Sequence, residues 1–325
     1  MKLILKKLFA FCLSVMYYFT PFVAPATDAP ITVTDPDNVK LTFAAVADPQ
    51  ISNYMLKRDR YFKAMGEDIG NAQCDIDALL MAGDIAENGF QCEYDRVSEI
   101  IGATGVKNYI LSVGNHDVRL RLYKNTVKKF TEYMNSLNEK AGSDLRIDSL
   151  HYTCNINGYN FIVLGTDRTE FEESYLNEEQ LAWLDASLKE FTAEGKPVFV
   201  MIHQTFKDTH GLPDTWNSPF DSAGTVGKQS EALYNIMNKY QNVIMITGHL
   251  HTGFGQYSYE KLGNIHSINL PSATVDNKDG DYNENGIGYF VEVTDSNVLF
   301  RARNFNKGEF VPDYDISIDI RDCRI

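Results

Sequence analysis

Five short apolar runs in this sequence share one feature: each ends in residues whose side chains bind metal ions. The runs have the length of buried β-strands. The clusters that follow them are Asp48-Pro49-Gln50, Gly83-Asp84, Gly114-Asn115-His116-Asp117, His203 and Gly248-His249-Leu250-His251. Ligands of open α/β sheets bind beyond the carboxyl ends of the strands. We therefore expect the five clusters to meet at one edge of a sheet.

The rest of the chain alternates between strand-length and helix-length segments. Strands are expected at residues 41–47, 78–82, 107–113, 150–156, 159–164, 197–202 and 243–247, and helices at residues 57–73, 93–103, 122–137, 177–191 and 229–240. After residue 265 the pattern is mostly β, with strands expected at 265–270, 288–294, 298–305 and 314–320. This order predicts an α/β domain of mixed sheets with helices outside.

Carboxylate, amide and imidazole side chains together favour first-row divalent metals. The predicted ligands are seven, too many for one four-coordinate ion, and they suit two metals that share a bridging carboxylate. They are Asp48, Gln50, Asp84, Asn115, His203, His249 and His251. Such a centre stays positively charged although the chain has a formal net charge of −14. It can attract a phosphate, whereas the acidic chain lacks the basic surface that binds extended nucleic acid.

These motifs resemble those of the calcineurin-like metallophosphoesterases. The resemblance implies a four-layer α/β/β/α sandwich of two mixed β-sheets flanked by helices, spanning residues 41–325, with a dinuclear metal site at the strand ends. It places Asp48, Gln50, Asp84 and His251 on one metal, and Asp84, Asn115, His203 and His249 on the other. His116 is then expected near the leaving group, with Asp117 orienting it.

The resemblance implies hydrolysis of phosphate esters by a hydroxide that bridges two divalent or mixed-valence metal ions (Mn, Fe or Zn). His116 is expected to act as general acid, and Asn115, His203 and Arg119 to contact the substrate, a small phosphorylated molecule or a phosphoprotein. Two alternatives are a cyclic-nucleotide phosphodiesterase or nucleotide-diphosphate hydrolase, and a catalytically silent binding protein. The silent protein is disfavoured because every ligand position holds a coordinating residue. The sequence leaves the oligomeric state open.

Two positions depart from the family pattern, and a third separates this chain from one subfamily. Gln50 stands where His is usual, and its amide oxygen is a harder, weaker ligand that favours manganese or iron over zinc. Gln204 replaces a second His found in many relatives, and Glu87 stands where purple acid phosphatases carry Tyr. The loops above the strand ends should select the substrate, with Ser52, Tyr54, Lys57, Arg58, His210 and Trp216 as candidates.

The N-terminus has the pattern of a secretory signal peptide over residues 1–26. Lys2, Lys6 and Lys7 precede an uncharged apolar stretch, and Ala24-Pro25-Ala26 offers a cleavage site. An uncleaved membrane anchor and a buried helix are the alternatives. Residues 27–40 are expected to be a linker. We expect export to the periplasm or medium without stable membrane insertion after cleavage. The mature chain would keep Cys74, Cys92, Cys154 and Cys323, which allow three complete disulfide pairings.

Overall fold

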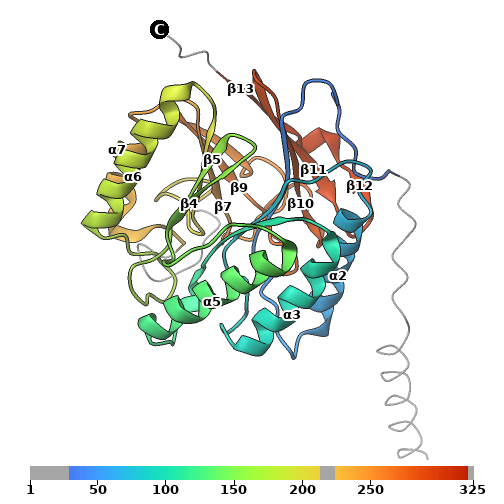
Figure 1. Cartoon of the computed structure of the whole chain (residues 1–325), viewed down its shortest axis with the longest axis horizontal. Coiled ribbons are helices and arrows are strands. Elements are labelled where there is room, and N and C mark those ends of the chain that lie inside the picture. Colours follow the sequence, from blue (N-terminus) through green and yellow to red (C-terminus); the bar gives the residue numbers. More distant parts are fainter. Residues whose placement is uncertain (1–28, 213–223, 321–325) are drawn as a thin grey trace, which may run out of the picture.

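The computed structural model describes residues 29–212 and 224–320, which form one layered fold (Figure 1). The expected signal peptide, Trp216 and Cys323 lie outside the described residues. None of the helices in the described ranges has the length and hydropathy of a membrane span. Within the same ranges Cys74, Cys92 and Cys154 form no disulfide.

The first sheet has the order β12-β11-β10-β1-β2-β3, and β13 also pairs with β11. β1, β2 and β3 run parallel, while β10 pairs antiparallel with β1. The bounds are β1 (Leu41–Val46), β2 (Ala78–Ala82), β3 (Asn108–Ser112), β10 (Ile287–Val293), β11 (Asn297–Asn304), β12 (Glu309–Phe310) and β13 (Ile316–Asp319).

The second sheet has the order β4-β5-β6-β7-β9-β8. Its four central strands, β5, β6, β7 and β9, are parallel. The bounds are β4 (Tyr152–Ile156), β5 (Tyr159–Val163), β6 (Val198–Met201), β7 (Val243–Thr247), β8 (Tyr259–Leu262) and β9 (Ile265–Asn269).

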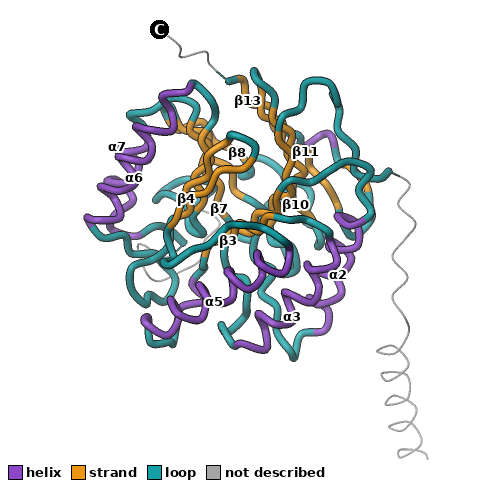
Figure 2. The backbone as a smooth tube through the Cα atoms, in the orientation of Figure 1, coloured by secondary structure: helices purple, strands orange, loops and turns teal. Residues whose placement is uncertain are grey.

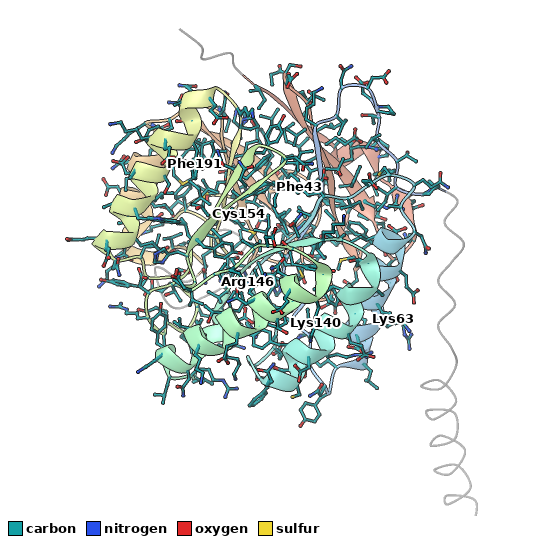
Figure 3. The ribbon with its side chains drawn as sticks, in the orientation of Figure 1. Phe43, Lys63, Lys140, Arg146, Cys154 and Phe191 are labelled. Carbon is teal, nitrogen blue, oxygen red and sulfur yellow. The ribbon has the colours of Figure 1, made fainter. Side chains whose placement is uncertain are left out.

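The two sheets pack face to face through aromatic side chains. Phe43 on β1, which Figure 3 labels, lies between the sheets. Its ring meets those of Phe161 on β5 and Phe199 on β6 edge to face, with ring centroids 5.7 and 5.2 Å apart. Helices α2 (Leu56–Gly70), α3 (Gln91–Ile101) and α5 (Tyr123–Ala141) lie outside one sheet, and α6 (Glu178–Phe191) and α7 (Ser230–Met237) lie outside the other (Figure 2). The predicted four-layer sandwich of two mixed sheets is confirmed.

The expected strands and helices are present, with ends that differ by a few residues. Three short elements were not expected: α4 (Asn115–Val118), β8 and β12. α4 begins inside a Gly-Asn sequence that is typical of a turn, and β8 carries the mostly half-exposed sequence YEKL, which has little strand signal. Residues 29–40 contain no helix or strand, yet Ile31 is fully buried in the core.

Candidate metal centre

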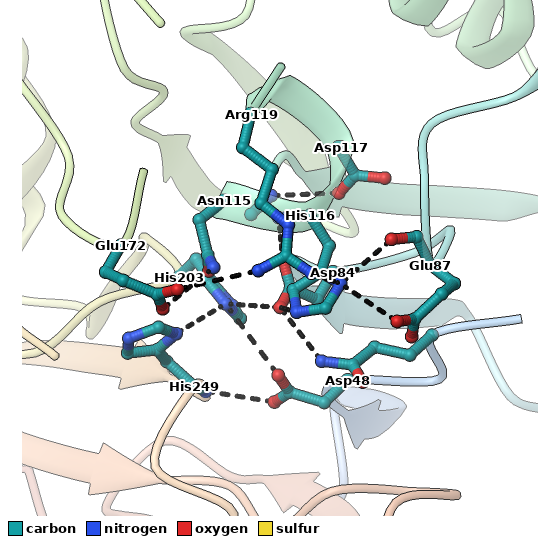
Figure 4. Close-up of polar contacts among 12 residues, drawn as sticks. Asp48, Asp84, Glu87, Asn115, His116, Asp117, Arg119, Glu172, His203 and His249 are labelled. Atoms are coloured by element: carbon teal, nitrogen blue, oxygen red, sulfur yellow. Dashed lines mark hydrogen bonds and ion pairs between the residues drawn. The ribbon is translucent and has the colours of Figure 1, made fainter. Parts of the chain in front are cut away.

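The seven predicted metal ligands lie together at the carboxyl ends of strands from both sheets. Figure 4 labels five of them: Asp48, Asp84, Asn115, His203 and His249. Nε2 of His203 lies 3.2 Å from Oδ2 of Asp84 and 3.7 Å from Oδ1 of Asp48. Nε2 of His251 lies 3.0 Å from Oδ1 of Asp48. One ligand atom each of Asp84, His203 and His249 lie within 4.8 Å of one another, a spacing that can hold a metal ion.

The backbone at this centre is strained. Five of the seven ligand residues have left-handed φ angles between 38° and 73°, which non-glycine residues rarely adopt: Asp48, Gln50, Asp84, His249 and His251. Each such conformation costs on the order of 1–3 kcal/mol and persists only where the surrounding structure enforces it. The strain turns the chain sharply at the strand ends, so that ligands from both sheets converge.

Gly114 and Gly83 leave the space that the ligands occupy. A Cβ atom on Gly114 would lie 2.1 Å from Oδ1 of Asp84, and one on Gly83 would lie 2.4 Å from Nδ1 of His203. Neither position tolerates a side chain without moving a ligand. The glycines that precede these motifs therefore act by close packing, and Gly83 also adopts a φ of 81°.

The pKa values of the two buried histidines that follow β6 and β7, His203 and His249, shift in opposite directions. Burial opposes protonation of His203, but the negative charges of Asp84 and Asp48 outweigh it and raise its pKa to about 10. Burial and the neighbouring charge of His203 hold the pKa of His249 well below its usual value. Nδ1 of His203 contacts the carbonyl oxygen of Ala82 at 2.7 Å, which leaves Nε2 toward the centre. The carboxylates thus attract positive charge, which a metal ion supplies better than a proton.

The side-chain amides of Asn115 and Gln50 differ in whether their oxygen is available to bind a metal ion. Oδ1 of Asn115 is buried and accepts no hydrogen bond among the described residues, which suits an oxygen ligand. Nε2 of Gln50 donates to Oδ2 of Asp84 at 3.1 Å, so this amide has to turn before its oxygen can bind a metal. The donor set of carboxylate, amide and imidazole fits two divalent ions.

Asp117 has a different role from the one predicted. Its carboxylate accepts hydrogen bonds from the backbone N–H groups of Ile85, Ala86 and Gly114 and from the hydroxyl of Tyr94, at 2.9 to 3.1 Å. Both oxygens are thus engaged away from the imidazole of His116. The expectation that Asp117 orients His116 is wrong: it ties the Asp84 loop to the Asn115 loop.

The His116 ring is held instead by Glu87 and Arg119 (Figure 4). Nδ1 lies 2.9 Å from the carbonyl oxygen of Glu87 and 2.8 Å from Nη2 of Arg119. Nε2 lies 3.8 Å from Oδ2 of Asp84 and therefore faces the centre. Arg119 lies next to the centre through its contact with His116, and its expected contact with the substrate stays a prediction.

Two acidic residues near the centre were missed by the sequence analysis as site residues. Glu172 accepts a hydrogen bond from Nδ2 of Asn115 at 3.2 Å, and Glu87 forms an ion pair with Arg58. Arg58 also donates to the carbonyl oxygen of Gln50 at 3.0 Å. Glu172 lies in the acidic run Glu170-Phe171-Glu172-Glu173, which reads as a solvated loop and gives no signal of a site.

His210 does not reach the site. It is fully buried; Nδ1 lies 2.8 Å from the carbonyl oxygen of Tyr257, and Nε2 lies 2.7 Å from Oγ of Ser267. Its candidacy for substrate selection is therefore wrong. Other candidates do line a cleft of about 760 Å³ beside His251: Tyr54, Lys57 and Arg58 lie in its wall, together with Lys278.

Residues 41–253 match the family model of the calcineurin-like phosphoesterases, about two thirds of the chain. The chain belongs to this family and is a metal-dependent phosphoester hydrolase.

Two relatives carry names of phosphodiesterases. A 3′,5′-cyclic-nucleotide phosphodiesterase of Nostoc sp. is 24% identical over 65% of this chain and 68% of its own. A probable glycerophosphodiester phosphodiesterase, GpdQ, of Arcobacter nitrofigilis is 27% identical over 56% of this chain and 59% of its own. The crystal structure of a dimetal phosphatase from Danio rerio shares the fold, with a TM-score of 0.61 and 14% identity over 87% of this chain and 100% of the other.

Proposed function

We propose that this protein is an exported phosphodiesterase that cleaves small phosphodiesters at a centre of two metal ions. The observation that carries the diester assignment is the cleft of about 760 Å³ that opens beside the ligand His251. A diester keeps one organic group on phosphorus while the other leaves, so its site needs room for both. The names of the two relatives, both phosphodiesterases, support the same substrate class.

The lining of the cleft suits an anionic or aromatic substituent. Lys57 and Lys278 bring positive charge to its walls, and Tyr54 offers an aromatic ring with 88% of its surface exposed. Nζ of Lys57 forms an ion pair with Oδ1 of Asp276 at 3.0 Å, whereas Lys278 has no carboxylate partner within 4 Å in the described part of the chain. A nucleotide and a glycerophosphodiester both match these walls in charge and size.

His116 is the proton donor in this proposal. Nδ1 can accept a hydrogen bond from Nη2 of Arg119 or donate one to the carbonyl oxygen of Glu87, and in both cases Nε2 faces the centre and can protonate the leaving oxygen. Two bound metal ions supply Lewis acidity: they lower the pKa of water and offset charge on the phosphoryl oxygens. Asn115 and His203 position the second ion, and Arg119 adds positive charge next to the leaving group.

The metals are proposed to be manganese, iron or zinc. Gln50 in place of His weakens the binding of the ion that Asp48 and His251 would hold. Its amide oxygen also favours manganese or iron over zinc at that position. His203 and His249 offer imidazole nitrogens to the other ion, which suits iron or zinc as well.

Export rests on the N-terminal pattern of residues 1–26. Mass spectrometry of the protein recovered outside the cytoplasm should find an N-terminus near residue 27. A soluble cytoplasmic product that retains Met1 would refute export and leave the catalytic proposal untouched.

The function is tested by turnover of the metal-loaded protein on a substrate panel. The panel pairs bis(p-nitrophenyl) phosphate with p-nitrophenyl phosphate, and adds 3′,5′-cyclic AMP, a glycerophosphodiester and a nucleoside diphosphate. We expect diesters to be cleaved with higher kcat/KM than monoesters, and Asp84→Asn to abolish both. Faster cleavage of the monoester or the nucleoside diphosphate would overturn the diester assignment.

A further inference from the structure

The large hydrophobic side chains that the described residues expose all lie on one side of the molecule. They are residues 54–56, Phe90, Leu120, Leu122 and Phe171, which we call the apolar rim. The four loops that carry them follow β1, β2, β3 and β5, and these strands all end at the edge that holds the metal centre. The apolar rim therefore lies on the same side of the molecule as the metal centre.

Contacts between the loops make the rim continuous. The guanidinium of Arg121 stacks over the ring of Phe90 at 4.2 Å from its centroid and donates to the carbonyl oxygen of Asn88. Oγ1 of Thr169 donates to the carbonyl oxygen of Arg121, which joins the loop of Phe171. Nδ2 of Asn53 lies 2.8 Å from Sγ of Cys92, which joins residues 54–56 to the loop of Phe90.

Leu120 is held outward at a cost in backbone strain. Its φ is 59°, in the left-handed region that bulky residues avoid, and 83% of its surface is exposed. Glycine or asparagine would relieve the strain at this exposed position. A leucine held in this way presents an apolar side chain to something outside the fold.

The loop of Leu120 and Leu122 is basic, in contrast to the acidic run beside Phe171 and to the chain as a whole. Leu120 and Leu122 alternate with Arg119, Arg121 and Lys124, and residues 118–126 contain no acid, although the chain has a formal net charge of −14. Arg121 and Lys124 have no carboxylate partner within 4 Å among the described residues. Apolar tips between unpaired cations match a surface of anionic headgroups over an apolar interior.

We propose that the apolar rim docks on the surface of an anionic phospholipid membrane. Leu120 and Leu122 enter the headgroup region, and Arg121 and Lys124 contact lipid phosphates. Docking turns the metal centre toward the membrane, where amphiphilic phosphodiesters collect. The proposal concerns binding and stands apart from the catalytic assignment.

The test is cosedimentation of the protein, in the form to which cells process it, with vesicles of phosphatidylcholine alone or mixed with phosphatidylglycerol. We expect binding to the anionic vesicles that weakens with added salt. Leu120→Asp with Leu122→Asp should lower the bound fraction at least about tenfold, since the two leucines that would enter the membrane are lost. Lys140→Glu, at the far end of α5, lowers the charge by the same two units and should bind like the parent (Figure 3).

A folding control and a second variant keep the outcome clear. Thermal unfolding checks that the double variant folds; if it does not, Arg121→Gln with Lys124→Gln replaces it and should remove the preference for anionic vesicles. Equal binding of parent and rim variants, or equal binding to neutral and anionic vesicles, would overturn the proposal. The proposal would also be overturned if the parent protein did not bind vesicles and instead self-associated or bound an acidic protein.

Discussion

Oε2 of Glu172 accepts a hydrogen bond from Nδ2 of Asn115 over 3.2 Å, and this contact decides which end of the amide faces the metal centre. A carboxylate only accepts hydrogen bonds, so the amide nitrogen must face Glu172 and Oδ1 is left for a metal ion. The other carboxylate oxygen lies 3.5 Å from Arg119, the residue that also contacts His116. Glu172 therefore supports both a ligand and the proposed proton donor.

Removal of this support should weaken metal binding. Glu172→Ala should lower the affinity of the Asn115 site about 10- to 100-fold, as for other residues that orient metal ligands. Glu172→Gln keeps an acceptor oxygen and should lose less. Calorimetric titration of the metal-free variants with Mn²⁺ measures both, and unchanged affinity in the alanine variant would remove Glu172 from this role.

Gly114→Ala should disrupt the centre through packing. The new methyl group would lie 2.1 Å from Oδ1 and 2.3 Å from the backbone nitrogen of Asp84, so the bridging residue has to move. We expect a loss of about 1–3 kcal/mol in the free energy of unfolding, together with loss of metal. Gly102→Ala is the matched control, because a methyl group there meets nothing within 4 Å. Urea unfolding and metal analysis of both variants give the answer, and similar behaviour of the two would contradict the packing argument.

His210 should make stability depend on pH. Burial lowers its pKa from 6.5 to about 4, so below pH 6.5 the unfolded chain binds a proton that the folded chain refuses. The free energy of unfolding should then fall as the pH drops from about 6.5 to 4, by at most about 1.4 kcal/mol per pH unit, with no contribution above pH 6.5.

His210→Asn removes this titration and tolerates the local φ of 51°. Between pH 4 and 6.5 the variant should lose less stability than the parent per unit of pH, whatever its stability at pH 7. Denaturant unfolding at several pH values measures the two slopes, and parallel slopes would show that His210 is not the group responsible.

The fold and the meeting of the candidate ligands could be predicted because each cluster is local and follows a strand. Convergence then needs only that parallel strands end at one edge. The contacts of Asp117, Glu87 and Glu172 could not be predicted, because they depend on how loops from different strands face one another. Asp117 lies next to His116 in the sequence, yet its side chain turns to the backbone of Ile85 and Ala86.

Gln50→His should tighten the metal that Asp48 and His251 share. An imidazole nitrogen binds zinc more strongly than an amide oxygen does, so the variant should also shift its preference toward zinc. Calorimetry with Zn²⁺ and Mn²⁺ on parent and variant tests this, with the Asn115 site as internal reference. If the two sites of the parent bound metal equally well, and the variant did not change this, the interpretation that Gln50 weakens its site would be contradicted.

His116→Gln should slow the reaction according to how much the leaving group needs a proton. An alkoxide is a poor leaving group without protonation, whereas p-nitrophenolate leaves unaided. We therefore expect a loss on the order of 10²–10⁴ in kcat for alkyl diesters and a much smaller loss for bis(p-nitrophenyl) phosphate. Metal content should remain that of the parent, because no ligand is changed. Equal losses on both substrates would leave His116 a phosphate-positioning residue, held by Arg119 and Glu87 for contact and not for proton transfer.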